Sequence, residues 1–355
     1  MNTSNSNENS ITYALTELGW QAYFQQQLSL DELEQSFCGR VIAHHRNAYI
    51  VQLENTQISL VISSSLPAMT VGDWLILDSN KQFNRLLQRK SLVSRRAAGT
   101  KVVEQYIAAN IDTMFIVCSL NQDFNLNRIE RYLAIANEAQ VEPVVVLTKK
   151  DLCENWQAHV SQVQALDPFL AVEAVCALEK SSVESLSSWC TSGKTVSFLG
   201  SSGVGKSSLV NTLLGVSEQV TSHIREDDSK GRHTTTSRSL HFMVNGSVLL
   251  DTPGMREIQL VECHDGLNKT FADIELLEIS CRFSDCQHQN EPGCAILQAL
   301  DNGSLEQRRL DNFLKLREEQ ARNAASLKEK RDKSKALSKM YRSVSIDARQ
   351  MKKGY

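Results

Sequence analysis

Short apolar runs separated by polar turns dominate the chain after its first 36 residues. Runs of this length, bounded by turn residues, predict β-strands. The predicted strands are 39–44, 48–53, 58–62, 72–77 and 86–93. Five short strands in succession predict a small β-barrel of the OB type, and an SH3-like barrel would leave much the same pattern.

The pattern changes at residue 111, where strongly apolar strands begin to alternate with helices. The segment 127–139 carries Ile129, Leu133 and Ala136 at helical spacing. Further helices are predicted at 183–190 and 206–214, and strands at 113–119, 144–147, 172–176, 196–199, 240–244 and 248–250. This alternation predicts an α/β domain whose parallel sheet is covered on both faces. A Cys/His segment follows, and then a helical stretch that is increasingly basic from about Leu305.

Composition narrows the class of protein. The chain has 355 residues, 41% hydrophobic and 22% charged, which excludes wholesale disorder. No apolar run approaches the ~20 residues of a membrane-spanning helix, and the first ten residues lack the features of a secretory signal. The nine cysteines are an odd number and mostly scattered, which favours a reducing compartment. We therefore expect a cytoplasmic protein without a membrane partner.

Charge is distributed unevenly along the chain. The formal net charge is −3, yet residues 1–39 contain no Lys or Arg. Seven basic residues and no acid lie between 79 and 103, and 322–355 carries a net charge of +8. Beside a predicted OB-type barrel, the first basic run predicts contacts with RNA phosphates, and the basic tail predicts a second RNA contact.

A phosphate-binding motif, G-x-x-x-x-G-K-S, follows the predicted strand 196–199 and opens a helix. Backbone N–H groups of such a loop surround nucleotide phosphates, Lys206 reaches the β- and γ-phosphates, and the Ser207 hydroxyl ligates Mg²⁺. The candidate phosphate-binding residues are Gly200, Ser201, Ser202, Gly203, Val204, Gly205, Lys206, Ser207 and Ser208.

A D-x-x-G motif ends the predicted strand 248–250 and places Asp251 behind the Mg²⁺, with the Gly254 N–H near the γ-phosphate. The polar stretch 217–238 lies between the two motifs and contains three consecutive threonines, 234–236. One of these hydroxyls, with Thr235 as the candidate, completes the Mg²⁺ coordination as a nucleotide-sensing switch.

The base-reading motif is found upstream, at the end of the predicted strand 144–147. It consists of Thr148, Lys149, Lys150 and Asp151, which match the guanine-reading pattern N/T-K-x-D. Asp151 accepts hydrogen bonds from guanine N1–H and N2–H₂, which adenine does not offer, and Lys149 lies over the ring. Cys176 and Ala177, at another strand end, are candidates for a backbone N–H to guanine O6. If the four-residue string were a chance turn, the phosphate loop would belong to an ATP-using enzyme.

A third motif supplies a complete set of metal ligands. Cys281, Cys286, His288 and Cys294 follow the spacing C-x₄-C-x-H-x₅-C. Three thiols and one imidazole predict a tetrahedral zinc site with a structural role, because no position is left for a catalytic water.

The motifs occur in a permuted order, with T-K-K-D before G-S-S-G-V-G-K-S-S, G-R-H-T-T-T and D-T-P-G, and the zinc spacing last. This combination resembles the ribosome small subunit-dependent GTPase A family (RsgA, also called YjeQ). The resemblance implies a circularly permuted GTPase that hydrolyses GTP to GDP, faster on the ribosome. It implies binding to the small ribosomal subunit and its rRNA during late maturation, by a monomer.

The resemblance also implies a division of the chain and a catalytic candidate. The expected segments are a flexible acidic leader (1–36), an OB-fold RNA-binding domain (37–98), a GTPase domain (99–262), and a zinc-binding domain with basic helices (263–355). Met255 stands where many GTPases place a water-orienting Gln, so the family pattern makes His233 the candidate substitute. The alternative function is an RNA-binding assembly scaffold in which the GTPase domain is only structural.

Overall fold

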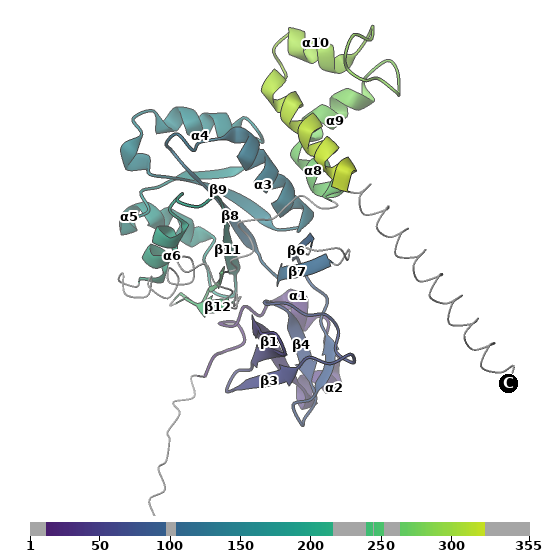
Figure 1. The fold of residues 1–355 in the computed structure, drawn as a ribbon. Helices are drawn as coiled ribbons and strands as arrows, with labels where there is room; N and C mark the ends of the chain where they lie inside the picture. The colour runs from purple at the N-terminus through teal and green to yellow at the C-terminus, as the bar shows by residue number, and fades with distance from the viewer. Residues whose placement is uncertain (1–11, 97–103, 216–238, 244, 252–262, 324–355) are drawn as a thin grey trace, which may run out of the picture. The chain divides into compact units, whose positions relative to one another are not determined.

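The computed structural model describes residues 12–96, 104–215, 239–243, 245–251 and 263–323 (Figure 1). The chain divides into two compact units, one of residues 1–93 with 106–258 and one of 94–105 with 259–355. Within the described residues, no helix has the length and apolar character needed to cross a bilayer.

The first unit begins with a curled antiparallel sheet (Figure 1). Its strands are β1 (Phe37–His44), β2 (Ala48–Gln52), β3 (Gln57–Val61), β4 (Trp74–Leu77) and β5 (Phe83–Leu86). They pair in the order β3-β2-β1-β4-β5, around a core that includes Val41, Val51 and Leu75. The predicted OB-type architecture is confirmed as a half-barrel, since β3 and β5 do not pair in the described part of the chain.

The strand predicted at 86–93 is wrong. The chain leaves the sheet after Leu86, and the Lys90 N–H donates to the side chain of Asn110 instead of to a strand ladder (2.8 Å). A new strand, β6 (Leu92–Arg96), then pairs with β7 (Glu104–Ala109) in a separate two-stranded sheet. The sequence pattern joined the end of β5 to the start of β6 because both carry apolar side chains. The two strands belong to different sheets.

Residues 12–36 of the acidic leader are folded. They form α1 (Ala22–Gln25) and α2 (Leu30–Gln35), and the second helix begins with a capping box between Ser29 and Glu32. Trp20 packs edge-on against Trp74, with 4.8 Å between ring centroids. This part of the leader is therefore not the mobile segment that its composition suggested, because Leu18, Trp20 and Phe24 are buried.

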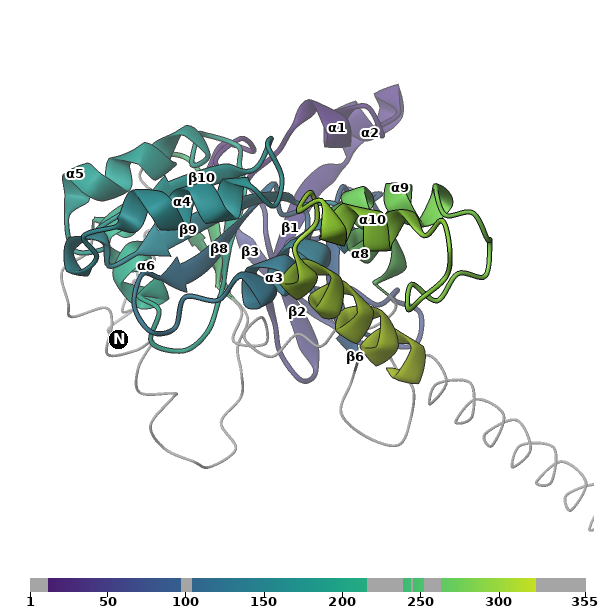
Figure 2. The ribbon, with the colours of Figure 1, turned by 90° about the horizontal axis from the view of Figure 1, so that it is seen from above.

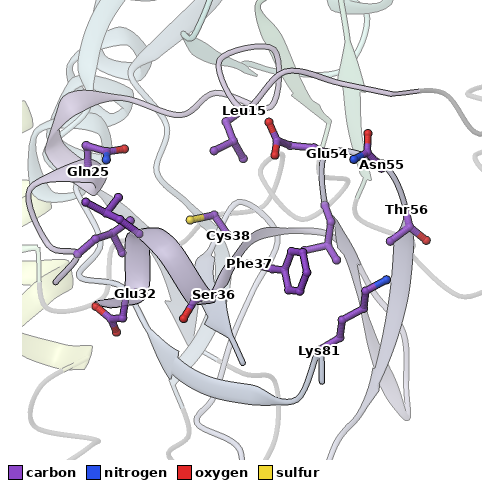
Figure 3. Close-up of a pocket in the computed structure, with 13 residues that line it drawn as sticks. Leu15, Gln25, Glu32, Ser36, Phe37, Cys38, Glu54, Asn55, Thr56 and Lys81 are labelled. Carbon is purple, nitrogen blue, oxygen red and sulfur yellow. The ribbon is translucent and has the colours of Figure 1, made fainter. Parts of the chain in front are cut away.

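A pocket of about 420 Å³ lies between this leader and the half-barrel (Figure 3). Leu15, Phe37, Cys38 and Lys81 are among the residues that line it. The Lys81 Nζ atom lies 5.9 Å from the Phe37 ring centroid. Burial raises the pKa of the Cys38 thiol to about 11, so this cysteine is protonated at neutral pH.

The sheet of the half-barrel continues, through the antiparallel pairing of β1 with β12 (Ser239–Phe242), into a part that is mainly parallel. Its strands are β8 (Thr113–Ser119), β9 (Glu142–Thr148), β10 (Ala171–Ala174), β11 (Thr195–Leu199), β12 (Ser239–Phe242) and β13 (Val248–Asp251). Their order is β10-β9-β8-β11-β13-β12, with β12 antiparallel. Strands added after β8 extend the sheet one way and those after β11 the other, so the loop after β11 lies at a topological switch point, where α/β proteins bind ligands.

Helices cover both faces of this sheet (Figures 1 and 2). They are α3 (Leu126–Glu138), α4 (Trp156–Gln164), α5 (Lys180–Val183), the 3₁₀ turns Lys150–Leu152 and Glu184–Ser188, and α6 (Lys206–Leu214). Ile116 and Cys118 of β8 pack with α3 and α4, whereas Phe115 and Val117 pack with α5 and α6. This alternation confirms the predicted parallel sheet with two covered faces.

A buried polar network joins the leader, the half-barrel and the parallel sheet. Arg40 of β1 is fully buried and donates to Leu18 O and to Thr195 Oγ1 (2.8 Å) of β11. Burial lowers the pKa of Arg40 to about 10. Asp112 accepts from Lys90 Nζ (2.6 Å) and from the Thr195 N–H (2.8 Å). Burial would raise the pKa of Asp112, but these donors outweigh it and hold the pKa below its usual value.

The second unit is helical where it is described beyond residue 262. Its helices are α8 (His264–Thr270), α9 (Ala272–Ile279) and α10 (Ala295–Asp301), followed by helical residues 307–323. Phe271 and Phe313 are buried against each other, with 5.3 Å between ring centroids. The Cys/His segment connects α9 to α10.

Candidate nucleotide and metal sites

The phosphate loop connects β11 to α6. Its backbone needs conformations that favour glycine, with φ of +79° at Gly203 and +97° at Gly205, the N-cap of α6. Lys206 Nζ donates to Gly200 O (2.7 Å) and to Ser201 O, which holds the ammonium group across the loop. The nine-residue helix α6 directs its N-terminal N–H groups toward the same loop, an arrangement that favours bound phosphate.

The base-reading motif lies directly against this loop. Thr148 is buried at the end of β9, and its Oγ1 donates to Val204 O (2.5 Å). Lys149, which has a φ of +61°, extends Nζ to Gly203 O (3.1 Å). Two segments more than 50 residues apart in the sequence therefore form one continuous surface. The hydroxyl of Thr148 makes the bracing bond to the phosphate loop even though Asn is the commoner residue at this position.

Lys150 and Asp151, the next residues of the motif, lie just after β9. Lys150 and Asp151 begin a 3₁₀ turn, and Lys150 Nζ lies 4.0 Å from the Trp156 ring centroid. Asp151 is exposed and close to Cys176, whose pKa is raised by burial and further by that carboxylate. β10 thus brings Cys176 beside Asp151.

The Cys176 N–H has a partner within the chain. It donates to Ser182 Oγ (2.8 Å), a bond that would have to be exchanged for the Cys176 N–H to meet guanine O6. The chain turns after β10, so that Ser182 of α5 reaches back to this N–H. Cys176 and Ala177 both stay predictions for the contact with guanine O6.

Arg128 contacts the phosphate loop, although none of the sequence motifs indicated it. It lies in the first turn of α3, and its Nη1 donates to Ser201 Oγ of the phosphate loop (2.9 Å) and to Asp123 Oδ1 (2.7 Å). No local pattern marks Arg128, because its partner Ser201 is distant in the sequence. Only the pairing of β8 with β11 brings the two together.

Several predicted site residues lie outside the described residues. His233, Thr235 and Gly254 belong to this group. Asp251 is described through its backbone, which ends β13 opposite Ser239 of β12. Ser207 and Ser208 lie in the first turn of α6, directly after Lys206.

The basic run 79–103 is less available to RNA than its charge suggested. Arg85 pairs with Glu32 (2.7 Å), Arg89 with Asp73 (2.7 Å) and Lys90 with Asp112 (2.6 Å). The hydrogen bond from Arg85 lowers the pKa of Glu32 to about 2. The sequence did not reveal these pairings because the acidic partners come from the leader and from the residues just before β4 and β8.

The four predicted metal ligands converge in the second unit. The ligand atoms of Cys281, Cys286, His288 and Cys294 all lie within 4.8 Å of one another. Cys281 Sγ is 3.9 Å from Cys294 Sγ, and His288 Nδ1 is 3.7 Å and 3.5 Å from these two sulfurs. Ligands about 2.3 Å from a tetrahedral zinc ion would be separated by about 3.8 Å, so the donor set and its spacing fit zinc.

The environment of Cys281 favours the metal-binding thiolate. Burial would raise the pKa of Cys281, but the backbone N–H groups of Ala295 and Ile296 at the start of α10 and the neighbouring thiols bring it below its usual value. Cys294 is the N-cap of the same helix, and its sulfur accepts from the Leu297 N–H (3.5 Å). Thiolate is the form that binds metal.

Replacing Thr148 by Val tests the brace between the two nucleotide motifs. The change keeps the shape of the side chain but leaves the Val204 carbonyl without its buried donor, which costs about 1–3 kcal/mol. We expect GTP affinity to fall about five- to tenfold and the Tm to drop. Equilibrium nucleotide binding and thermal unfolding measure both effects. Thr148→Ser keeps the hydroxyl and should retain wild-type affinity; equal loss in both variants would rule out a role for the hydrogen bond.

Two family models match this chain. The RsgA GTPase model matches residues 86–261, which include both nucleotide motifs. An ABC transporter model matches residues 183–351, a range that contains the phosphate loop, a feature of ATPases and GTPases alike.

Relatives that match most of the chain distinguish between these families, and solved structures show the same fold. A small ribosomal subunit biogenesis GTPase RsgA 2 from Vibrio parahaemolyticus is 58% identical, over 98% of this chain and 97% of the relative. An RsgA from Mesorhizobium japonicum is 42% identical over 87% and 91%. The fold resembles YjeQ from Thermotoga maritima (TM-score 0.59, 24% identity, 79% of this chain and 97% of that one). It also resembles YloQ, a circularly permuted GTPase (TM-score 0.56, 23% identity, 81% and 96%). This chain belongs to the RsgA GTPase family and is a GTP hydrolase.

Proposed function

We propose that this GTPase binds the small ribosomal subunit through its rRNA and assists late maturation, with GTP hydrolysis permitting release. The relatives that match nearly the whole chain are named small ribosomal subunit biogenesis GTPases. We further propose that it acts as a cytoplasmic monomer. The observation that carries the guanine nucleotide specificity is the direct bonding of the T-K-x-D segment to the phosphate loop.

In this proposal, different residues bind the phosphates, the base and the Mg²⁺ ion. The backbone from Gly200 to Ser208 surrounds the phosphates, and the Lys206 ammonium group neutralises their charge. Asp151 accepts from guanine N1–H and N2–H₂, Lys149 covers the ring, and Ala177 N–H meets O6. Ser207, Thr235 and Asp251 are the residues that would hold Mg²⁺. When bound, this ion neutralises charge on the β- and γ-phosphates.

Hydrolysis proceeds by in-line attack of water on the γ-phosphate. In this proposal, His233 orients the water because the residue after the D-x-x-G motif, Met255, carries a thioether that does not. The Gly254 N–H contacts the γ-phosphate. Arg128 holds the phosphate loop in place through Ser201. A site completed from outside by the ribosome makes intrinsic turnover slow.

The segment 37–98, which contains the half-barrel, and the basic C-terminal residues provide the RNA contacts. Arg85, Arg89 and Lys90 are held in internal ion pairs, so the proposed phosphate contacts fall on the remaining basic residues of the run. Lys81, at the rim of the pocket, is one of them. The Cys281, Cys286, His288 and Cys294 cluster holds one structural Zn²⁺.

GTP turnover with and without purified small subunits tests this function. We expect small subunits to raise kcat at least about tenfold, since completion of a GTPase site in trans produces large accelerations. Large subunits at the same concentration serve as the control and should leave kcat unchanged. Turnover that stays flat on addition of small subunits would contradict the proposed coupling and favour the scaffold alternative.

A further inference from the structure

The imidazole of His288 presents its two nitrogens to different partners. Nδ1 faces the thiols of Cys281 and Cys294, at 3.7 and 3.5 Å. Nε2 lies 3.1 Å from Oε1 of Glu278, in the last turn of α9. The backbone of His288 has a φ of +58°, a strained value for a residue with a side chain. A strained backbone persists where several contacts fix it, and here the ring is fixed from both ends.

Glu278 connects this ring to a distant helix. The same Oε1 atom accepts from Nη1 of Arg317 (2.7 Å), which belongs to helical residues 307–323. That helix is attached along one face: Arg309 pairs with Asp273 (2.7 Å), and Phe313 packs on Phe271. Residues 309, 313 and 317 are four apart, so they share this face. Arg317 is the member of this face that reaches the metal cluster through one carboxylate.

We infer that His288 binds zinc through Nδ1, and that Glu278 and Arg317 form an outer shell that couples zinc binding to attachment of the C-terminal helix. This inference rests on the proposed zinc site. Glu278 is a positioning residue: it accepts a hydrogen bond from Nε2–H, fixes the tautomer that leaves Nδ1 free to bind metal, and makes the imidazole a better ligand. Arg317 acts through Glu278 by holding its carboxylate in place.

The coupling is reciprocal. A zinc ion on Nδ1 withdraws electron density from the ring, so Nε2–H becomes a stronger donor to Glu278. The fixed carboxylate is in turn a better partner for Arg317. By thermodynamic linkage, attachment of the helix must then raise the affinity for zinc by the same factor.

Nitrogen-15 NMR of the full-length, zinc-loaded protein with labelled histidine tests the ring orientation. We expect the His288 signals to show a metal-bound Nδ1 and a protonated Nε2. His288→Ala identifies these signals among those of the eight histidines. A metal-bound Nε2 would overturn the inference while leaving the zinc site itself intact. A full-length protein that binds no zinc would instead overturn the zinc proposal on which the inference rests.

Competition with a chelator measures the contribution of the outer shell to zinc affinity. Glu278→Gln is expected to weaken zinc binding about 10- to 100-fold, the usual effect of losing an outer-shell carboxylate. Arg317→Gln should weaken it about three- to tenfold, because its ion pair is half exposed. In the double variant, the Arg317 change should add nothing to the loss from Glu278→Gln, since Arg317 acts through that residue.

Matched variants and a second readout separate this role from general destabilisation. Glu275→Gln lies one turn earlier in α9, and Lys315→Gln removes a charge from the same C-terminal helix. Both should keep wild-type zinc affinity. Removing zinc should speed amide hydrogen exchange in residues 307–323 of the wild type, and do so much less in Glu278→Gln. Equal zinc affinities in Glu278→Gln and Glu275→Gln would overturn the coupling. Amide hydrogen exchange in residues 307–323 that does not change when zinc is removed would overturn it as well.

Discussion

Replacing Lys206 by Ala is expected to lower kcat/KM for GTP by about 10³-fold. The ammonium group is held across the phosphate loop by Gly200 O and Ser201 O, where it faces the charge that develops on the transferred phosphoryl group. Losing one preorganised donor to such charge costs about 10²–10³ in rate, and Lys206 also contributes to binding of the ground state. Steady-state GTPase assays, with the Tm measured in parallel, quantify the loss.

Lys194→Ala provides the matched control. Lys194 precedes the same strand, β11, at the end away from the phosphate loop, and its side chain is partly exposed (45%) near Asp112. The control should keep wild-type turnover and Tm. If Lys206→Ala abolished turnover and still supported small-subunit maturation in cells, the scaffold alternative would replace the coupled GTPase. If Lys206→Ala kept wild-type turnover, the loop would not bind the reacting phosphates.

Replacing Asp151 by Asn is expected to change the base that the enzyme accepts. The Asp151 carboxylate matches the N1–H and N2–H₂ donors of guanine, whereas an amide presents a donor to the O2 of xanthine. Hydrogen bonds to a charged group contribute about 1.5–3 kcal/mol each, so KM for GTP should rise about 10²-fold or more. XTP should become the better substrate, while kcat on XTP stays near the wild-type kcat on GTP.

Glu154→Gln is the control for this exchange, since it neutralises an exposed carboxylate three residues further along the chain. It should keep the preference for GTP. If Asp151→Asn kept the wild-type KM for GTP, Asp151 would not bind the guanine base. T-K-K-D could then no longer be interpreted as the guanine motif. An equal preference of the wild-type enzyme for ATP would have the same consequence.

The features that were predictable from sequence are those carried by neighbouring residues. The strand-loop-helix around Lys206 follows from glycine spacing, and β8 and α3 follow from the period of their apolar residues. The C-x₄-C-x-H-x₅-C spacing contains its whole ligand set within fourteen residues, and these ligands do converge. Such patterns are local, so a single chain displays them without an alignment.

The errors arose where a residue's partner is distant in the sequence. The leader seemed too polar to fold, yet Trp20 and Phe24 are buried against Trp74. The run from Lys81 to Lys101 seemed free to bind RNA, yet Asp73 and Asp112 neutralise two of its charges. Composition counts charges and apolar groups without indicating which of them meet.

Sequence alone determined the motifs on which the proposed chemistry rests: a phosphate-loop motif, the T-K-K-D string and a Cys/His set, each contained in a short stretch of chain. The tertiary structure decided how they are joined. It placed Thr148 on Val204, Arg128 on Ser201, and Glu278 between His288 and Arg317. Contacts of this kind depend on strand order and helix packing. These in turn depend on burial summed over the whole chain, which no local pattern contains.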